Sequence, residues 1–322
     1  MRAMISRHFS SEYDSTRWGN GTMSVDFRLH GIITALSTPF STTGVVEEDS
    51  LRELVEFQIE RKVNGFFSLG TTGLGPIMKA EQRKQVAEIV VEEARGRLPV
   101  IVQIGASDPL QSLELAAHAE KIGADAVASL TPFYYQPGED AILQYYSRLS
   151  ETTKLPILVY NIPRHTGNNV DAKLLLNLSK ISNVVGIKDS SRDFSQLLDY
   201  LEIAPPAFNV INGTDSFHFS ALCAGARAGV SAGANAFPEL FVGLYEAYRE
   251  GNLDRGRQLQ LKIHAMRTVL TNPPIAPLLE VLRMRGLKSG LVKPPLRSMY
   301  PRETQELRAY LGRLLPEIKL IQ

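Results

Sequence analysis

The sequence has few of the features that define special classes of protein. Its 322 residues include one cysteine, Cys223, which cannot form an internal disulfide and is typical of a reducing compartment. The formal net charge of +1 gives no electrostatic reason for binding nucleic acid or an anionic membrane. No apolar run approaches the roughly 18 residues that a membrane span needs, and the six histidines show no metal-site spacing. We expect a cytoplasmic protein without a metal, a nucleic-acid partner or a membrane partner.

The first 28 residues differ in composition from the rest of the chain. They are rich in Ser, Arg, Asn and Gly without a period, and they contain the only tryptophan, Trp18. They have no continuous apolar segment of the kind found in secretory signals, and Glu12 and Asp14 argue against a transit peptide. We interpret residues 1–28 as a flexible N-terminal extension, or as a segment lost because translation begins at Met23. Residues 29–322 then form the folded domain.

From Gly31 onward, short apolar runs alternate with longer amphipathic segments. The expected strands begin near Ile32, Gly65, Val100, Ala126, Ile157, Val184, Asn209 and Gly229. Helical patterns between them include Glu47–Lys62, Lys79–Arg95, Pro109–Ile122, Glu139–Thr152 and Asp171–Lys180. Eight strand-then-helix units of this size predict an α/β fold, a closed (β/α)8 TIM barrel.

A doubly wound open sheet is the alternative fold. It would more often carry a nucleotide-binding fingerprint after the first strand, and the turn there, Thr38-Pro39-Phe40-Ser41, has none. A helical tail, about residues 240–322, follows the last predicted strand, and it is broken at Pro273-Pro274 and Pro294-Pro295. The expected architecture is therefore a barrel with additional C-terminal helices.

Lys188 stands near the end of the buried-strand pattern Val184–Asp189. Desolvation disfavours the ammonium form, so an amine at this place can be partly neutral near pH 7. A neutral amine attacks a ketone and forms a Schiff base, which then serves as an electron sink. The alternative is a lysine that extends from a strand end into solvent.

Other reactive residues are expected at the same mouth of the barrel, since active sites of this fold gather at the C-terminal strand ends. Tyr160 ends the fifth strand, and its hydroxyl could transfer protons during Schiff-base formation. The glycine-flanked pair Thr71-Thr72 offers hydroxyls and backbone N–H groups that suit a carboxylate. A 2-keto acid requires both features, because the amine reacts with its ketone and the hydrogen-bond donors hold its carboxylate.

These segments resemble the dihydrodipicolinate synthase/N-acetylneuraminate lyase family of pyruvate-dependent class I aldolases. The resemblance runs from Gly31 into the tail and rests on Gly70-Thr71-Thr72-Gly73, Tyr160-Asn161-Ile162-Pro163 and Gly186-Ile187-Lys188-Asp189. It implies a (β/α)8 barrel with extra C-terminal helices, in which Lys188 forms an imine with pyruvate and no other cofactor takes part.

The resemblance also implies roles for individual residues. Tyr160 would be the proton shuttle, Thr71 part of the proton relay, and Thr72 the contact of the keto-acid carboxylate. Tyr134 matches a tyrosine that many members lend to a neighbouring site across a dimer interface, in homotetramers built as dimers of dimers. Beyond Thr72, the expected substrate-binding set comprises Gly73, Arg164, His165, Gly213 and Val230.

The second substrate is suggested by the loop after the fifth strand. Where dihydrodipicolinate synthases usually carry an arginine that holds the aspartate-semialdehyde carboxylate, this chain has His165, with Arg164 one place earlier. Histidine cannot reproduce a bidentate guanidinium clamp. Leu74 replaces a usual glutamate, and the motifs are most similar to archaeal-type 2-keto-3-deoxygluconate aldolases.

We therefore predict reversible cleavage of a 2-keto-3-deoxy sugar acid to pyruvate and an aldehyde. Three alternatives remain open. They are 4-hydroxy-tetrahydrodipicolinate synthase, which joins pyruvate to aspartate semialdehyde in lysine biosynthesis, a keto-deoxy sugar acid dehydratase, and a non-catalytic barrel that binds a keto acid.

Overall fold

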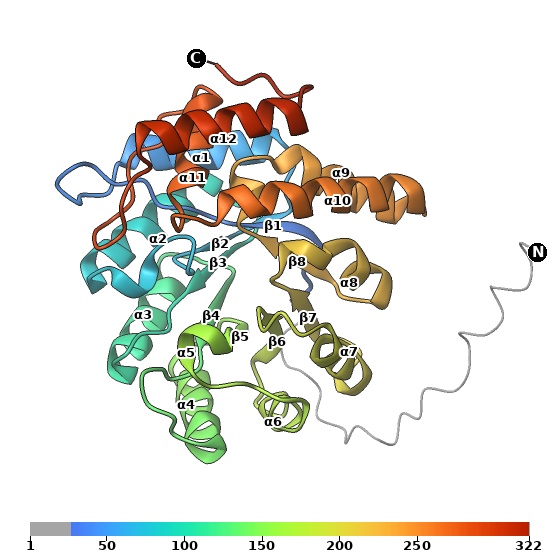
Figure 1. The fold of residues 1–322 in the computed structure, drawn as a ribbon. Coiled ribbons are helices and arrows are strands. Elements are labelled where there is room, and N and C mark those ends of the chain that lie inside the picture. Colours follow the sequence, from blue (N-terminus) through green and yellow to red (C-terminus); the bar gives the residue numbers. More distant parts are fainter. Residues whose placement is uncertain (1–26, 322) are drawn as a thin grey trace, which may run out of the picture.

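The protein is a closed barrel of eight parallel strands surrounded by helices (Figure 1). The structure, a computed structural model, describes residues 27–321. The strands pair in chain order, and β8 closes the barrel against β1. Their bounds are β1 (Gly31–Ala35), β2 (Gly65–Ser68), β3 (Val100–Gln103), β4 (Ala126–Leu130), β5 (Ile157–Asn161), β6 (Val184–Asp189), β7 (Asn209–Asn212) and β8 (Ala228–Ser231).

The helices follow the strands in alternation and continue beyond the last one. Those associated with the barrel are α1 (Glu48–Glu60), α2 (Ala80–Ala94), α3 (Pro109–Lys121), α4 (Glu139–Thr152), α5 (Pro163–Thr166), α6 (Ala172–Leu178), α7 (Phe194–Ile203), α8 (His218–Ala224) and α9 (Pro238–Arg249). The C-terminal ones are α10 (Leu253–Leu270), α11 (Ala276–Met284) and α12 (Pro301–Leu314). The predicted (β/α)8 barrel is confirmed, and each strand begins within one residue of its expected start.

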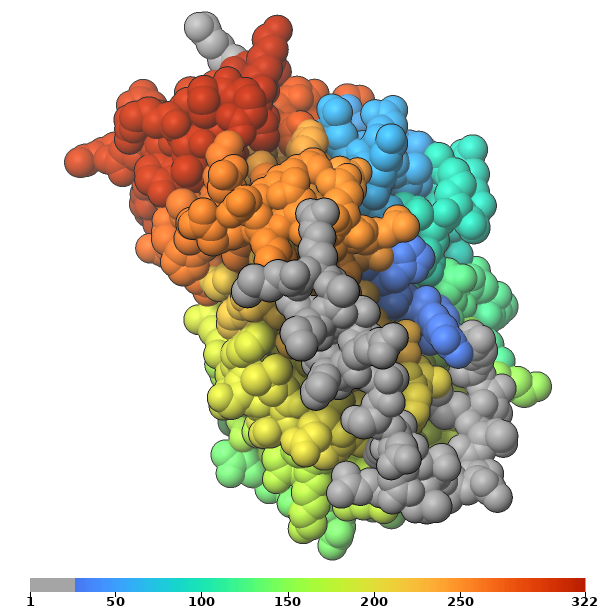
Figure 2. Space-filling model, turned by 90° about the vertical axis from the view of Figure 1, so that its right-hand side faces the viewer, coloured from blue at the N-terminus to red at the C-terminus, as the bar shows by residue number. Residues whose placement is uncertain are grey.

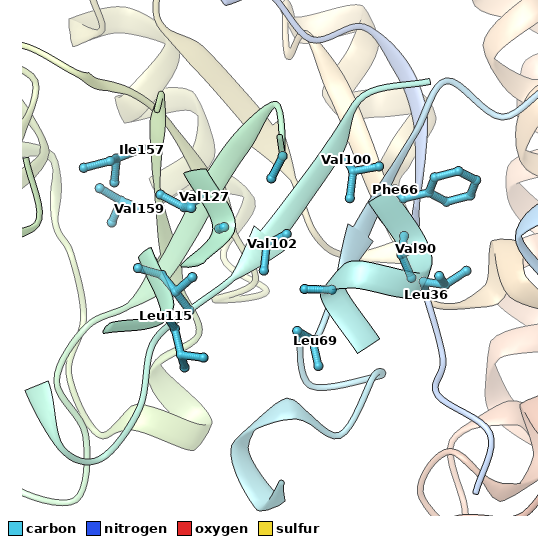
Figure 3. Close-up of a cluster of buried hydrophobic side chains, with 14 of the residues drawn as sticks. Leu36, Phe66, Leu69, Val90, Val100, Val102, Leu115, Val127, Ile157 and Val159 are labelled. Atoms are coloured by element: carbon cyan, nitrogen blue, oxygen red, sulfur yellow. The ribbon is translucent and has the colours of Figure 1, made fainter. Parts of the chain in front are cut away.

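The strands are buried on both faces, which explains their nearly continuous apolar sequences. One set of side chains packs outward against the helices; Figure 3 shows Val102 and Val159 among them, with Leu115 of α3 and Val90 of α2 in the same cluster. The alternate set fills the barrel interior. Tyr160 belongs to the interior set, and it is the Cα partner of Lys188 across the β5–β6 pairing.

Asn235 ties the β1–β8 side of the barrel together. Its side-chain nitrogen donates to the carbonyl of Ala35, 2.7 Å away, and its side-chain oxygen accepts from the N–H of Ser37 at 2.9 Å. The carbonyl of Asn235 also accepts from the amide of Gln58 at 3.0 Å. The residue therefore has a structural task at this end of the barrel.

The C-terminal helices form a second layer on one side of the barrel. Helix α9 follows β8 as the eighth barrel helix, so the additional helices begin with α10 rather than near residue 240. The predicted breaks agree with the structure, since Pro273-Pro274 separates α10 from α11 and Pro294-Pro295 precedes α12. Figure 2 shows α9 and α10, in orange, beside the red α12. Buried side chains of these helices form one cluster, which includes Ile263 and Leu311.

The flexible extension predicted for residues 1–28 lies, apart from its last two residues, outside the described part of the chain. Within residues 27–321, none of the helices combines the length and the apolarity that a membrane span requires.

Candidate active site

A cavity of about 580 Å³ opens at the C-terminal ends of the strands. Its wall includes most of the residues predicted to form a site. These are Thr71, Thr72, Tyr160, Arg164, His165, Lys188, Gly213 and Val230. The size suits a small organic ligand.

Lys188 lies in the cavity wall at the end of β6, with 4% of its surface exposed. Its Nζ is 3.8 Å from the centroid of the Phe67 ring and 3.9 Å from that of Tyr160. Burial lowers the pKa of this amine, while Tyr160 and the charge of Asp215 act in the opposite direction. Desolvation is the largest of these effects, so the environment favours the neutral, nucleophilic amine more than water does.

Tyr160 connects Lys188 with the turn after β2. Its hydroxyl forms a hydrogen bond with Oγ1 of Thr71, 3.2 Å away, and either oxygen can be the donor. Its ring meets Phe67 edge-on with centroids 5.4 Å apart, which fixes the direction of the hydroxyl. A chain of two hydroxyl groups next to an amine can move protons to and from a reacting carbonyl.

The turn that carries Thr71 and Thr72 is closed by two backbone hydrogen bonds. Leu74 donates to the carbonyl of Thr71 at 3.2 Å, and Gly75 donates to that of Gly70 at 3.3 Å. Leu74 adopts a left-handed conformation, with φ at 61°. Within the described residues, the N–H groups of Thr71 and Thr72 donate to no backbone carbonyl or side chain. Such free N–H groups at a cavity wall are suited to an anion.

Gly213 lies close against Lys188 at the end of β7. A Cβ atom there would be 2.2 Å from the hydroxyl oxygen of Ser190, 2.8 Å from the carbonyl of Asp189 and 3.2 Å from Cε of Lys188. The N–H of Gly213 donates to the carbonyl of Asp189 at 2.7 Å. A residue without a side chain is therefore required for the lysine to keep its place.

Asp189, which follows the lysine, is buried on the other side of the strand. Its carboxylate accepts hydrogen bonds from the Ser191 hydroxyl at 2.7 Å and from the Asn161 side chain at 2.9 Å. Burial raises its pKa, and these hydrogen bonds act against that effect. The network holds the end of β6 to the end of β5, and so keeps Lys188 in register with Tyr160.

Arg164 and His165 lie in α5, the short helix directly after β5. Gly167 ends this helix with φ at 74°, a conformation that glycine adopts without strain. Both side chains line the cavity. Burial, followed by the charges of Arg164 and Arg192, lowers the pKa of His165 and favours its neutral form.

Comparison with known proteins agrees with this geometry. The model of the dihydrodipicolinate synthetase family matches residues 28–314. The chain belongs to this family. Its members are carbon–carbon lyases, and the chain is accordingly an aldolase-type lyase that acts on small molecules. The family resemblance inferred from the motifs is thus confirmed.

Individual relatives span nearly the whole chain. A 4-hydroxy-tetrahydrodipicolinate synthase of Methanopyrus kandleri is 33% identical over 298 residues, covering 90% of this chain and 99% of that protein. The crystal structure of the dihydrodipicolinate synthase of Thermotoga maritima has a TM-score of 0.83 at 33% identity, with 90% and 99% coverage. YagE, an E. coli K12 prophage protein of the same family solved in complex with pyruvate, has a TM-score of 0.86 at 27% identity, with 89% and 98% coverage.

Two of the residues predicted to belong to the site, Tyr134 and Gly73, do not line the cavity. Tyr134 is 85% exposed and adopts a φ of 79°, and its ring packs edge-on against Tyr135. Gly73 is buried behind the wall, where its carbonyl accepts a hydrogen bond from Thr38 at 2.8 Å. Space is short around Gly73, since a Cβ would be 2.8 Å from the carbonyl of Leu36. Its part is to shape the turn.

The cavity also includes residues that sequence reasoning did not assign. Asp215 lines the wall, with its carboxylate 3.2 Å from Nε2 of the fully buried His218 and accepting from the N–H of Gly233 at 3.1 Å. Arg192 comes from the loop after β6, and Arg267 from α10. Their position after predicted strand ends could have singled out Asp215 and Arg192, but nothing in the sequence relates α10 to the barrel mouth.

The C-terminal tail also supplies apolar wall. Leu270, Ile275, Leu278 and Leu296 all line the cavity. In residues 27–321, no three His, Cys, Asp or Glu side chains are arranged to hold a metal ion.

Proposed function

We propose that the enzyme cleaves a 2-keto-3-deoxy sugar acid to pyruvate and an aldehyde through an imine on Lys188. The observation that carries this proposal is the buried amine of Lys188 next to the Tyr160–Thr71 hydroxyl pair in one cavity. Burial lowers the pKa of the amine, which increases the fraction able to attack a ketone.

The reaction begins when the neutral Nζ of Lys188 attacks the keto carbon of the substrate. The Tyr160 hydroxyl passes a proton to the oxygen of the resulting carbinolamine, water leaves, and a protonated imine remains. The deprotonated Tyr160 oxygen then takes the proton of the C4 hydroxyl, the C3–C4 bond breaks, and its electron pair moves into the imine to give an enamine. The aldehyde leaves, the Tyr160 hydroxyl gives its proton to C3, and water hydrolyses the protonated imine to release pyruvate, the free amine and a proton that restores the Tyr160 hydroxyl.

The imine is itself the electron sink, so the proposal requires no added cofactor and no metal. The keto-acid carboxylate would lie against Thr72 and the free N–H groups of the Thr71-Thr72 turn. Val230 and Gly213, which line the same cavity, would contact the pyruvate part. Extensive dialysis against a chelator should leave the rate of cleavage unchanged.

The second candidate is 4-hydroxy-tetrahydrodipicolinate synthase activity, which shares every step as far as the enamine. It is favoured by the names of relatives such as the Methanopyrus kandleri protein. The sugar-acid reaction is favoured by His165 and Leu74, because the neutral imidazole of His165 suits a hydroxyl group better than a carboxylate.

Two assays on one preparation separate these candidates. Pyruvate release from 2-keto-3-deoxygluconate measures cleavage, and condensation of pyruvate with aspartate semialdehyde measures the synthase. We expect kcat/KM for cleavage of 2-keto-3-deoxygluconate to be higher by about tenfold or more. With His165 in place of an arginine, the site lacks the charge-assisted hydrogen bonds that would hold the carboxylate of aspartate semialdehyde. A higher kcat/KM for aspartate semialdehyde would establish the second candidate instead.

We further propose a homotetramer in which Tyr134 completes the site of a neighbouring subunit. The supporting observation is that Tyr134 is exposed and has a positive φ, which is uncommon for a residue with a side chain. Tyr134→Phe should lower kcat by about tenfold or more if its hydroxyl takes part in proton transfer, while Tyr135→Phe serves as the control. A protein that is monomeric by sedimentation, fully active, and indifferent to Tyr134→Phe would contradict the proposal.

A further inference from the structure

Three arginine side chains meet at the cavity from segments far apart in the sequence. Arg164 comes from α5, Arg192 from the loop after β6, and Arg267 from α10. Figure 1 shows α5 beside β4 and β5, and α10 beside α9 near β8. The arginines therefore belong to separate elements that share only the cavity.

These arginines differ from most other arginines of residues 27–321, because none of the three forms a hydrogen bond or an ion pair with another described residue. Elsewhere arginines are typically paired, as Arg285 is with Glu239 and Arg97 is with Glu56. Arg164, Arg192 and Arg267 have no carboxylate partner within residues 27–321. Their guanidinium groups are available to a ligand.

The three charges act on one another unfavourably. The pKa of Arg192 is lowered, first by burial and then by the charges of Arg164 and Arg267. Arg192 is also held at a φ of 69°, a left-handed conformation that costs free energy for a residue with a side chain. An uncompensated group of like charges at a cavity is destabilising, and a bound anion removes that penalty.

The acidic residues nearby are already engaged. Asp215 is held by His218 and by the N–H of Gly233, and Asp189 is held by Ser191 and Asn161. Neither forms an ion pair with an arginine of the cavity. Within residues 27–321, the guanidinium groups of the three arginines therefore remain available to an anionic ligand.

We propose that Arg164, Arg192 and Arg267 bind a phosphate monoester at the aldehyde end of the substrate. This rests on the proposed function, in which the keto-acid carboxylate is held by the Thr71-Thr72 turn of the same cavity. Three guanidinium groups match a dianion with three acceptor oxygens better than a single carboxylate. The preferred substrate is then a 2-keto-3-deoxy sugar acid that is phosphorylated at its terminal carbon.

The test compares pyruvate release from 2-keto-3-deoxygluconate and from its 6-phosphate. It uses the full-length enzyme and the variants Arg192→Gln and Arg267→Gln. Arg249→Gln is the control, since this exposed arginine at the end of α9 lies away from the cavity. We expect the unchanged enzyme to prefer the phosphate ester by about 100-fold in kcat/KM, and each cavity variant to reduce that preference about tenfold, because each removes a charge-assisted contact.

Trapping of pyruvate with borohydride separates failure of this inference from failure of the proposed function. An enzyme that forms the Lys188 adduct but shows no preference for the phosphate ester lacks the phosphate site. An enzyme that forms no adduct contradicts the aldolase mechanism itself. An arginine-dependent preference for a terminal carboxylate, measured with aspartate semialdehyde, would assign the three arginines to a carboxylate and overturn the phosphate proposal. A preference unaffected by both cavity variants would also overturn it.

Discussion

Replacing Tyr160 with phenylalanine isolates the hydroxyl group that the proposed mechanism uses. In the structure this hydroxyl contacts Thr71 Oγ1 at 3.2 Å. The ring makes the remaining contacts, edge-on to Phe67 and 3.9 Å from Nζ of Lys188. Phenylalanine keeps this ring in the barrel interior, so the substitution removes a proton-transfer group and leaves the packing intact.

The expected loss of activity is much larger than the loss of stability. General acid–base catalysis contributes about 10²- to 10⁴-fold, so kcat for pyruvate release should fall within that range. The loss of one hydrogen bond should lower the free energy of unfolding by about 0.5–1.5 kcal/mol. The two effects separate because the stability loss reflects ordinary hydrogen bonding, such as that to Thr71, while the hydroxyl serves several proton transfers in each turnover.

The assay combines steady-state kinetics with urea unfolding and uses Tyr145→Phe as the matched control. The Tyr145 hydroxyl is buried and bonded to Ser129 at 2.7 Å, but it lies outside the candidate active site. The control should lose a similar amount of stability and keep its kcat. If Tyr160→Phe retained kcat to within about threefold of the unchanged enzyme, the proton-shuttle role would be refuted.

Three further changes test other parts of the account. Lys188→Met should raise the free energy of unfolding near neutral pH, measured by urea titration. Burial lowers the pKa of Lys188 in the folded state, so the unfolded lysine holds its proton over a wider pH range and the stability of the unchanged protein increases with pH. The stability difference between the variant and the unchanged protein should therefore shrink as the pH rises toward about 10.4. Gly213→Ala should slow imine trapping about tenfold or more, because its Cβ would be 2.8 Å from the backbone carbonyl of Asp189 and 3.2 Å from Cε of Lys188; an unchanged trapping rate would contradict the packing argument. Arg83→Ala should cost about 2–4 kcal/mol in urea unfolding, since this buried guanidinium donates to the Gly105 and Gln103 carbonyls; a loss below about 1 kcal/mol would count against it.

The barrel and its mouth could be predicted because their physical causes are local. Each strand is buried on both faces and therefore reads as an apolar run, and each amphipathic helix has its own period. Once the strands are known, the fold brings their C-terminal ends together. That geometry alone placed Lys188, Tyr160 and Thr71 side by side.

The remaining features depend on how distant elements meet. Arg267 lies in α10, and the side of the barrel covered by this helix follows from tertiary packing rather than from its sequence. Gly73 illustrates the converse, since it stands in the predicted motif but the tight turn puts it behind the cavity wall. The partner of Tyr134 is a further case, because a residue proposed to act on a neighbouring subunit cannot be placed by the fold of one chain.

The most direct test of the account is chemical trapping of the proposed imine. The folded enzyme is incubated with pyruvate and borohydride, digested, and analysed by peptide mass spectrometry. We predict one reduced three-carbon adduct, on the peptide that contains Lys188, and none in Lys188→Met. The absence of an adduct in folded protein, or its appearance on a different lysine, would contradict the central claim.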